Sequence, residues 1–296
     1  MSSSFSIGDL TIHRIVELVM PLRPALTMIP ALTPAILDEN RHWLEPDSLG
    51  PGDFFHLTFQ SYVVRTPHHV ILVDSCLGND KPRTQPQWNM KTDGTFMREL
   101  AGVGLAVDDI DYVMCTHLHV DHVGWNTRLV DGRWVPTFPN ARYVFSQREY
   151  VATQERHAAE GGYPVYVDSV LPIVEAGRAE LVADDYQLGD HLRMLPTPGH
   201  TKGHVAFCFG RNRDDAVMTG DLIHVPLQLR YPEFSFANDK DPVQSAATRR
   251  SFLERYCDSP TLCCTAHFPS PSTGHIKRWN DGFRLECTDH DRSRST

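Results

Sequence analysis

The sequence predicts an α/β fold, in which short buried strands alternate with helices. Two observations indicate this class. Between residues 57 and 265, short apolar runs bounded by turn residues alternate with longer segments of helical character. In addition, 41% of the 296 residues are hydrophobic, which is enough for a sizeable core at this length. Side chains with metal-binding chemistry follow several of the apolar runs directly, so we expect the functional residues on loops at strand ends.

The expected strands share a short apolar run that polar turn residues, Gly or Pro delimit. They cover residues 57–65, 70–74, 112–115, 178–183, 191–195, 205–209, 216–218 and 261–265. The expected helices cover residues 95–102, 146–157, 168–177 and 242–256. The last helix has the clearest beginning, because Asp241 and Pro242 form a suitable N-cap and first helical residue.

The chain is expected to fold as one domain over residues 1–287, followed by a flexible polar tail at 288–296. Residues 20–53 are rich in proline and show no regular pattern. Two interpretations of this segment stay open. It is either a lid over the active site that contributes to substrate binding, or a packed excursion at the surface.

The formal net charge of −9 argues against nucleic acid or an anionic membrane as the main partner. The first residues show no signal pattern, and the apolar stretch at 26–37 is too short to cross a bilayer. The seven cysteines are an odd number without a C-x-x-C pair, which is typical of reduced thiols. We therefore expect a cytoplasmic protein that acts on a small molecule, with no nucleic-acid or membrane partner.

The most informative motif places four potential metal ligands within six positions, namely His117, His119, Asp121 and His122. Imidazole and carboxylate suit zinc and similar divalent ions when a reactive oxygen shares the coordination sphere. A continuous strand would separate His122 from the other three, and a helix would not place His117 and His119 on one face. We therefore expect a loop after the strand at 112–115, where a turn can divide the ligands between two metal ions.

Three more candidate ligands lie farther along the chain, each beyond an apolar run. They are His200 within the segment 197–204, Asp221 after the run 216–218, and His267 after the run 261–265. Seven ligands are too many for one tetrahedral zinc ion. They suit two metal ions that share a carboxylate and a water-derived oxygen.

The ordered set of these seven ligands resembles the metallo-β-lactamase fold superfamily. The resemblance extends roughly from residue 10 to residue 286, and it includes the run 71–74, which is similar to an early family strand that ends in Asp. It implies a four-layer αββα sandwich, in which two sheets pack face to face between helices.

The same resemblance implies a role for each ligand. The first metal ion would be bound by His117, His119 and His200. The second would be bound by Asp121, His122 and His267, and Asp221 would bridge the two ions. Zinc is the expected metal, with manganese, iron or cobalt as alternatives. Asp74 and His204 would support the ligands by hydrogen bonds, although Asp74 could instead cap its loop.

Details of the motif narrow the resemblance to one branch. Asp221 as a bridge differs from the pattern of true β-lactamases, and His119 differs from the redox di-iron branch, which has Glu there. The branch with quorum-quenching N-acyl homoserine lactonases and methyl parathion hydrolase is the most similar. Where those lactonases carry Tyr three residues after the bridging Asp, this chain has His224.

The implied reaction is hydrolysis by a hydroxide that two metal ions hold between them, since metal coordination lowers the pKa of water from about 15.7 to about 7. Asp121 could accept the proton of this nucleophile, or serve as a ligand alone. His224 could contact the substrate or protonate a leaving group in place of the Tyr, or be a packed histidine. An aromatic pocket wall is expected from Trp88, Phe96, Trp125, Trp134 and Phe234, with ordinary core packing as the alternative for each.

The leading prediction is a dinuclear metal-dependent hydrolase that acts on a small apolar lactone or carboxylic ester. A phosphotriesterase resembling methyl parathion hydrolase is the near alternative, because it would use the same site. A non-catalytic, metal-stabilised binding module is the distant alternative. Relatives in this branch are often dimers, so a homodimer is expected.

Overall fold

The computed structural model describes residues 4–287, so the predicted tail at 288–296 lies outside the described residues. The chain forms two compact units. The first contains the described residues up to 18 together with residues 59–186, and the second contains residues 19–58 and the described residues from 187 onward. The expectation of a single domain over residues 1–287 stays a prediction. None of the helices in the described range is long and apolar enough to cross a membrane.

The first sheet carries most strands of the first unit. Its order is β1 (Ser4–Ile7), β2 (Leu10–Pro24), β4 (Phe54–Arg65), β5 (Val70–Val73), β6 (Tyr112–Met114), β9 (Arg142–Ser146) and β10 (Ala179–Val182), and β3 (Leu49–Gly50) pairs with β4. Strands β5, β6, β9 and β10 are parallel to their neighbours in this series. The carboxyl ends of β5 and β6 therefore lie at the same edge of the sheet.

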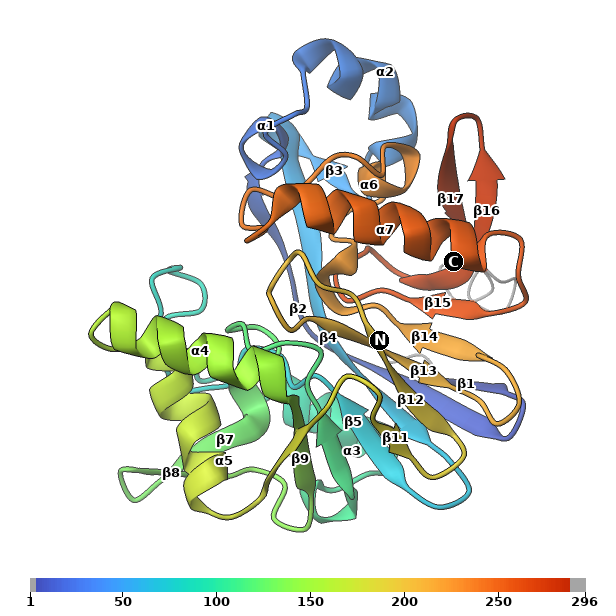
Figure 1. Cartoon of the computed structure of the whole chain (residues 1–296). Helices are drawn as coiled ribbons and strands as arrows, with labels where there is room; N and C mark the ends of the chain where they lie inside the picture. The colour runs from blue at the N-terminus through green and yellow to red at the C-terminus, as the bar shows by residue number, and fades with distance from the viewer. Residues whose placement is uncertain (1–3, 288–296) are drawn as a thin grey trace. The chain divides into compact units, whose positions relative to one another are not determined.

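Helices of the first unit pack on this sheet through apolar side chains. They are α3 (Thr95–Gly102), α4 (Gln147–Ala159) and α5 (Leu171–Glu175), with short 3-10 turns at Val107–Asp109 and Gly124–Asn126. Helix α4 contacts β9 and β10, and Figure 1 shows it in green alongside β9. Its N-cap is Ser146, whose hydroxyl accepts the Glu149 backbone N–H at 3.5 Å. A separate hairpin joins β7 (Thr127–Val130) to β8 (Arg133–Pro136).

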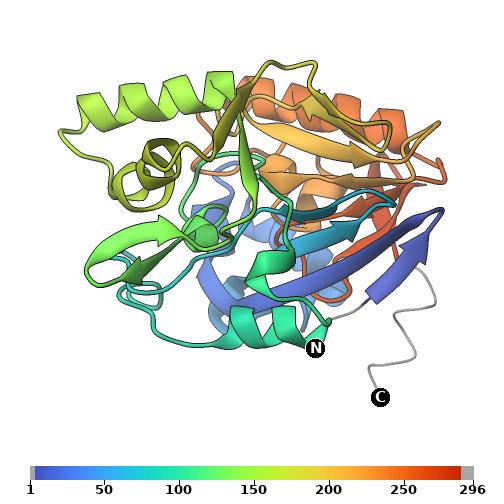
Figure 2. The same ribbon diagram turned by 90° about the horizontal axis from the view of Figure 1, so that it is seen from below.

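The second sheet belongs to the second unit. Its order is β11 (Gln187–Leu188), β12 (Leu192–Pro196), β13 (Val205–Phe209), β14 (Ala216–Met218), β15 (Leu262–Cys264), β16 (Thr273–Trp279) and β17 (Gly282–Glu286). A 3-10 turn at Gly220–Leu222 and helix α6 (Leu227–Arg230) follow β14. Helix α7 (Pro242–Tyr256) covers one face of this sheet (Figures 1 and 2). On this face Phe252 and Leu253 pack against Val217 and Cys263.

The proline-rich segment is more regular than the sequence pattern predicts. It contains α1 (Ala25–Met28), a 3-10 turn at Pro51–Asp53, and α2 (Pro34–Leu44), which is capped by the Thr33 hydroxyl. Helix α2 packs within the second unit, because Trp43 meets Trp279 edge to face at 5.1 Å and Asn40 donates to the Tyr231 hydroxyl at 3.1 Å. Its role as a lid stays a prediction.

Most expected elements are present, and the α/β class is confirmed. The predicted helix at 168–177 is wrong in its first half, where a π-helical turn at Tyr166–Val170 precedes the short α5. Pro172 has no N–H, so it cannot donate to the carbonyl oxygen of Asp168 as a regular helix requires. That carbonyl oxygen instead accepts the Thr127 hydroxyl.

Candidate metal centre

The ligand-rich motif lies on a loop after β6, as the sequence predicts. The strand ends at Met114, and the loop runs to the 3-10 turn that begins at Gly124. His117 and His122 are buried, whereas His119 and Asp121 are partly exposed. The loop can therefore present two histidines from inside the first unit and two ligands that a small molecule can reach.

Donor atoms on this loop lie close together. His117 Nε2 is 3.0 Å from His119 Nδ1, and the rings of His117 and His122 are 4.1 Å apart. His122 Nε2 lies 3.7 Å from a carboxylate oxygen of Asp121. His117 and His119 belong to one group of side chains that could hold a metal ion, and Asp121 and His122 belong to another. Such crowding of nitrogen and oxygen donors is typical of side chains that share cations.

Asp74 holds the orientation of His122. It follows β5 with a φ of 56°, in the left-handed region that Asp tolerates better than most residues. Its carboxylate lies 2.8 Å from His122 Nδ1, and it accepts the backbone N–H of Thr116 at 2.8 Å. Because Nδ1 of His122 faces a carboxylate, its Nε2 is the atom left for a metal ion. The supporting role of Asp74 behind a metal ligand stays a prediction.

Asp221 is the centre of the candidate ligands in the second unit. It lies in the 3-10 turn after β14 and is buried. One carboxylate oxygen, Oδ1, is 2.9 Å from His267 Nε2. The other, Oδ2, is 3.2 Å from Nε2 of both His200 and His224. Three imidazoles from three different loops therefore face one carboxylate.

Two of these imidazoles are oriented by a contact of their second ring nitrogen, Nδ1. His200 Nδ1 lies 2.8 Å from Asp239 Oδ1, and His267 Nδ1 lies 2.9 Å from the backbone oxygen of Thr58. A carbonyl oxygen can only accept, so Nδ1 of His267 carries the proton. In the neutral imidazole, Nε2 then points a lone pair at the Asp221 carboxylate, which is unfavourable unless a cation lies between them. The donor set therefore fits a divalent ion.

The raised pKa of His200 indicates that a positive charge is favourable beside Asp221 and Asp239. Burial alone lowers the pKa of His200, but its hydrogen bonds to Asp221 and Asp239 outweigh burial and raise that pKa to about 9. Two buried carboxylates on either side of one imidazole thus require a positive charge, which a proton or a metal ion can provide.

His204 has a different function from the candidate ligands. Its Nδ1 is 2.8 Å from the Thr197 hydroxyl, and its Nε2 accepts the backbone N–H of Asp221 at 2.9 Å. Both ring nitrogens are therefore used within the protein. His204 joins the loop after β12 to the turn that carries Asp221, and its supporting role for the ligands stays a prediction.

His224 is buried beside the candidate ligands. Its ring packs on Phe236 at 4.1 Å, and its backbone N–H donates to the Gln228 side chain at 2.8 Å. Among the described residues, its Nδ1 has no hydrogen-bond partner. Burial lowers the pKa of His224, so the ring is neutral at neutral pH.

Two functional residues escape the sequence analysis, namely Asp239 and Arg249. Asp239 contacts His200, and Arg249 on α7 lies 3.6 Å from the second oxygen of Asp239. The buried guanidinium also donates to the backbone oxygens of Leu222 and Phe234, at 2.8 Å each. No spacing rule links these residues to the ligands. The only local signal is that Asp239 stands close to the cap of α7.

The five aromatic residues expected in a pocket wall each pack against a neighbour of their own unit. Trp125 stacks on Phe96 at 5.5 Å, Trp88 meets Phe59 at 5.3 Å, and Phe234 stacks on Tyr231 at 4.9 Å. Trp134 lies under the Lys81 ammonium at 3.6 Å. The pocket wall stays a prediction.

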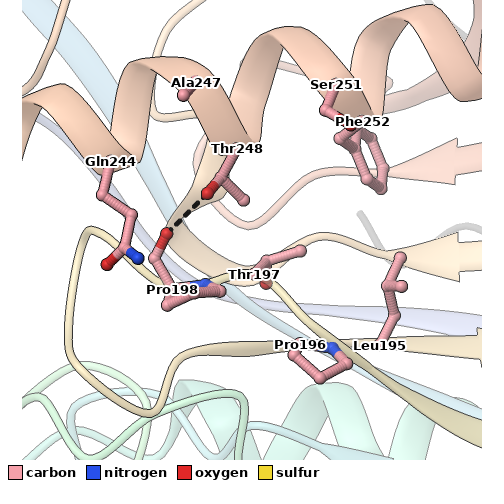
Figure 3. A pocket seen from close by; sticks show the side chains of 9 residues that line it. All are labelled: Leu195, Pro196, Thr197, Pro198, Gln244, Ala247, Thr248, Ser251 and Phe252. Carbon is pink, nitrogen blue, oxygen red and sulfur yellow. Dashed lines mark hydrogen bonds between the residues drawn. The ribbon is translucent and has the colours of Figure 1, made fainter.

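A groove of about 450 Å³ lies between the segment after β12 and helix α7 (Figure 3). It is bounded by the 195–198 segment and by Gln244, Thr248 and Phe252 of α7, and Thr248 donates to the Pro198 oxygen at 2.8 Å. None of the candidate ligands is among its lining residues. It is therefore a groove beside the helix and separate from the candidate ligands.

Comparisons with known proteins identify the family of this chain. Residues 60–267 match the sequence family described as "Metallo-beta-lactamase superfamily". An N-acyl homoserine lactonase from Bacillus sp is 24% identical over 203 residues, which cover 65% of this chain and 72% of that protein.

Solved structures extend the similarity over nearly the whole chain. The hydrolase AbOPH, of the beta lactamase superfamily, matches with a TM-score of 0.79 at 20% identity, covering 97% of this chain and 98% of that one. AidC, a dizinc quorum-quenching lactonase, matches with a TM-score of 0.77 at 20% identity and 97% coverage of both chains. At this level of identity the matches establish a shared fold, which confirms the predicted fold class.

Proposed function

Because this chain belongs to the metallo-beta-lactamase superfamily and is a metal-dependent hydrolase of that superfamily, we propose that it hydrolyses small, largely apolar lactones or carboxylic esters. The proposal depends mainly on the environment of Asp221. Three imidazole Nε2 atoms lie within 3.2 Å of its carboxylate oxygens. Lactonases among the similar proteins support an ester bond as the target.

The proposed site holds two divalent metal ions, with zinc as the preferred metal. The ligands follow the family pattern residue by residue. They are His117, His119 and His200 for the first ion, Asp121, His122 and His267 for the second, and Asp221 for both. When bound, such ions make hydroxide available from water near neutral pH and polarise the substrate oxygen. The dizinc site named for AidC supports this choice.

Asp121 and His224 are the proposed catalytic residues. Asp121 is partly exposed beside the buried His122, and its carboxylate would accept the proton of the attacking water. His224 is neutral, because burial lowers its pKa. A neutral imidazole can donate a hydrogen bond, which favours contact with the substrate oxygen over protonation of the leaving group.

The direct test is turnover of a matched substrate panel by the zinc-loaded protein, with and without a chelator. The panel contains aliphatic γ- and δ-lactones, N-acyl homoserine lactones, aryl esters and an aryl phosphotriester. Chelator-sensitive preference for lactones or esters is the expected result. Preference for the phosphotriester would assign the protein to the phosphotriesterase alternative, and no chelator-sensitive turnover would contradict the proposal.

Replacing the central carboxylate tests the two-metal site. Asp221→Asn should lower turnover by at least about 100-fold and reduce the zinc content below two ions per chain, because an amide is a weak ligand. Asp258→Asn, an exposed carboxylate in the same unit that pairs with Lys277, is the matched control. An Asp221→Asn variant with full turnover and one zinc ion would refute the dinuclear mechanism.

A further inference from the structure

Glu17 is a buried carboxylate that neither the family motif nor the proposed chemistry uses. It lies on β2 in the first unit, and its side chain has no exposed surface. Burial raises the pKa of this carboxyl, because a charged carboxylate is less favourable in the protein interior than in water. A residue of this kind needs strong partners to remain buried.

Three donors surround the carboxylate. Lys91 Nζ lies 2.7 Å from Oε1, and the indole N–H of Trp125 donates to the same oxygen at 2.8 Å. The backbone N–H of Leu77 donates to Oε2 at 2.7 Å. Each donor belongs to a different part of the chain, so one side chain links three segments of the first unit.

Two of these segments carry residues of the candidate metal centre. Leu77 follows Asp74 in the loop after β5, and Trp125 follows His122 in the loop after β6. The two loops are in direct backbone contact: Ser75 N–H donates to the His122 oxygen at 2.7 Å, and Trp125 N–H donates to the Ser75 oxygen at 2.8 Å.

Gly124 shows how closely the two loops approach. A Cβ atom at this position would lie 1.9 Å from the carbonyl carbon of Leu77, so only glycine fits. The hydrogen bond between Asp74 and His122 spans the same two loops. The orientation of His122 therefore depends on how the loops are held together.

We propose that Glu17 is a positioning residue for the metal centre, which fixes the loop of Asp74 against the loop of His122. It contacts neither substrate nor metal, and it acts through Leu77 and Trp125. This inference rests on the proposed function for its metal-binding consequence, but its effect on His122 is independent of any metal.

Glu17→Gln tests the inference with little change of shape. The amide has one acceptor oxygen, and its NH₂ group must face one of the three donors. The second zinc ion should then bind more weakly, by up to the roughly 10- to 100-fold that is usual when the direct partner of a ligand is removed. Zinc affinity is measured by competition with a chromophoric chelator, together with the stoichiometry.

A second readout uses the metal-free protein. The Nδ1–H proton of His122 is followed by NMR, and in Glu17→Gln it should shift and exchange faster with water. If the wild-type protein binds no zinc but this proton still responds, the proposed function fails while the positioning role stands. An unchanged proton signal together with unchanged zinc affinity would overturn the positioning role.

Two further variants separate positioning from stability. Asp168→Asn removes another buried carboxylate of the first unit, which pairs with Arg83 and contacts neither ligand loop through its side chain. It should lower the melting temperature without changing zinc affinity. Trp125→Phe keeps the ring and removes one donor, so it should fold and weaken the second zinc ion less than Glu17→Gln. Equal loss of zinc affinity in Asp168→Asn and Glu17→Gln would mean that Glu17 acts through stability alone.

Discussion

At the scale of single residues, the candidate ligands are held by side chains behind them. Asp74 orients His122, and Asp239 orients His200. Arg249 in turn lies 3.6 Å from Asp239, and it is fully buried. Such outer partners fix the tautomer and direction of an imidazole, so they determine metal affinity without touching the metal.

Asp239→Asn should weaken zinc binding by about 10- to 100-fold, because the amide keeps a hydrogen bond to His200 but loses the charge. The change also leaves the buried Arg249 guanidinium without its carboxylate, so the protein should be less stable as well. Zinc competition and thermal unfolding measure the two effects. Asp241→Asn, the same change two residues away, is the control, because Asn is an equally good N-cap. Equal zinc affinity in both variants would show that Asp239 has no orienting role.

The sequence predicts the candidate ligands with Asp74 and His204 beside them, but it does not predict Asp239, Arg249 or Glu17, and the reason is physical. His117, His119, Asp121 and His122 form a local pattern whose spacing restricts the backbone. Asp239 and Arg249 become partners of His200 only through tertiary packing of α7. Glu17 is 108 positions from Trp125, and a lone Glu in a strand has no sequence signal of its role.

At the scale of elements, short buried strands were the most predictable. The bounds of strands β5, β6, β13 and β14 agree with the predicted runs to within one residue. A short continuous apolar run between turn residues is typical of a strand that is buried on both faces. Strand β2 was missed over its 15 residues, since charged Arg14 and Glu17 interrupt the apolar pattern and become acceptable only through buried partners.

The beginnings of helices α7 and α2 can also be compared with the sequence signals for them. Asp241-Pro242 predicted the beginning of α7 correctly, and its carboxylate accepts the Gln244 N–H at 2.9 Å. Thr33-Pro34 is the same type of signal, and α2 does begin there. The sequence analysis did not predict this helix, because the segment around it is rich in proline. A proline at the first helical position is thus evidence for a helix even within an irregular segment.

The N-cap of α7 should make a measurable contribution to the free energy of unfolding. Asp241→Ala should lower the free energy of unfolding by about 0.5–2 kcal/mol, because the Gln244 N–H loses its acceptor. Asp241→Asn should change it by no more than a few tenths of a kcal/mol, since Asn caps equally well. Urea unfolding of both variants checks this. Equal destabilisation in the two would mean that the charge of Asp241, and not its cap bond, stabilises the helix.

At the scale of the whole molecule, stability should depend on pH through Lys81. This lysine is buried, its ammonium donates to the Thr127 hydroxyl at 2.9 Å, and it lies over the Trp134 ring. Burial lowers the pKa of Lys81 from 10.5 to about 7, although Asp168 and Asp80 oppose this change. Between these two values the unfolded chain binds more protons than the folded chain. The cost of burying Lys81 is therefore complete below pH 7 and decreases as the pH rises toward 10.5.

Lys81→Met isolates this effect. The stability of the wild-type protein relative to Lys81→Met should increase between pH 7 and pH 9, by up to about 1.4 kcal/mol per pH unit. Urea unfolding in the presence of a chelator removes any contribution from metal binding. Lys277→Met on β16, which removes a lysine that pairs with Asp258, is the control. A constant difference for Lys81→Met would show that the buried lysine keeps its charge.

The link between Glu17 and Trp125 also has a consequence for the order of folding. It joins residues 108 positions apart, so a long loop must close before the two ligand loops are fixed. Contacts of this range form late and slowly compared with local ones. A growing chain that already contains Glu17 must wait for more than a hundred further residues before that carboxylate meets its indole partner. Competence to bind metal should therefore appear with the last cooperative phase of refolding, well after the helices have formed.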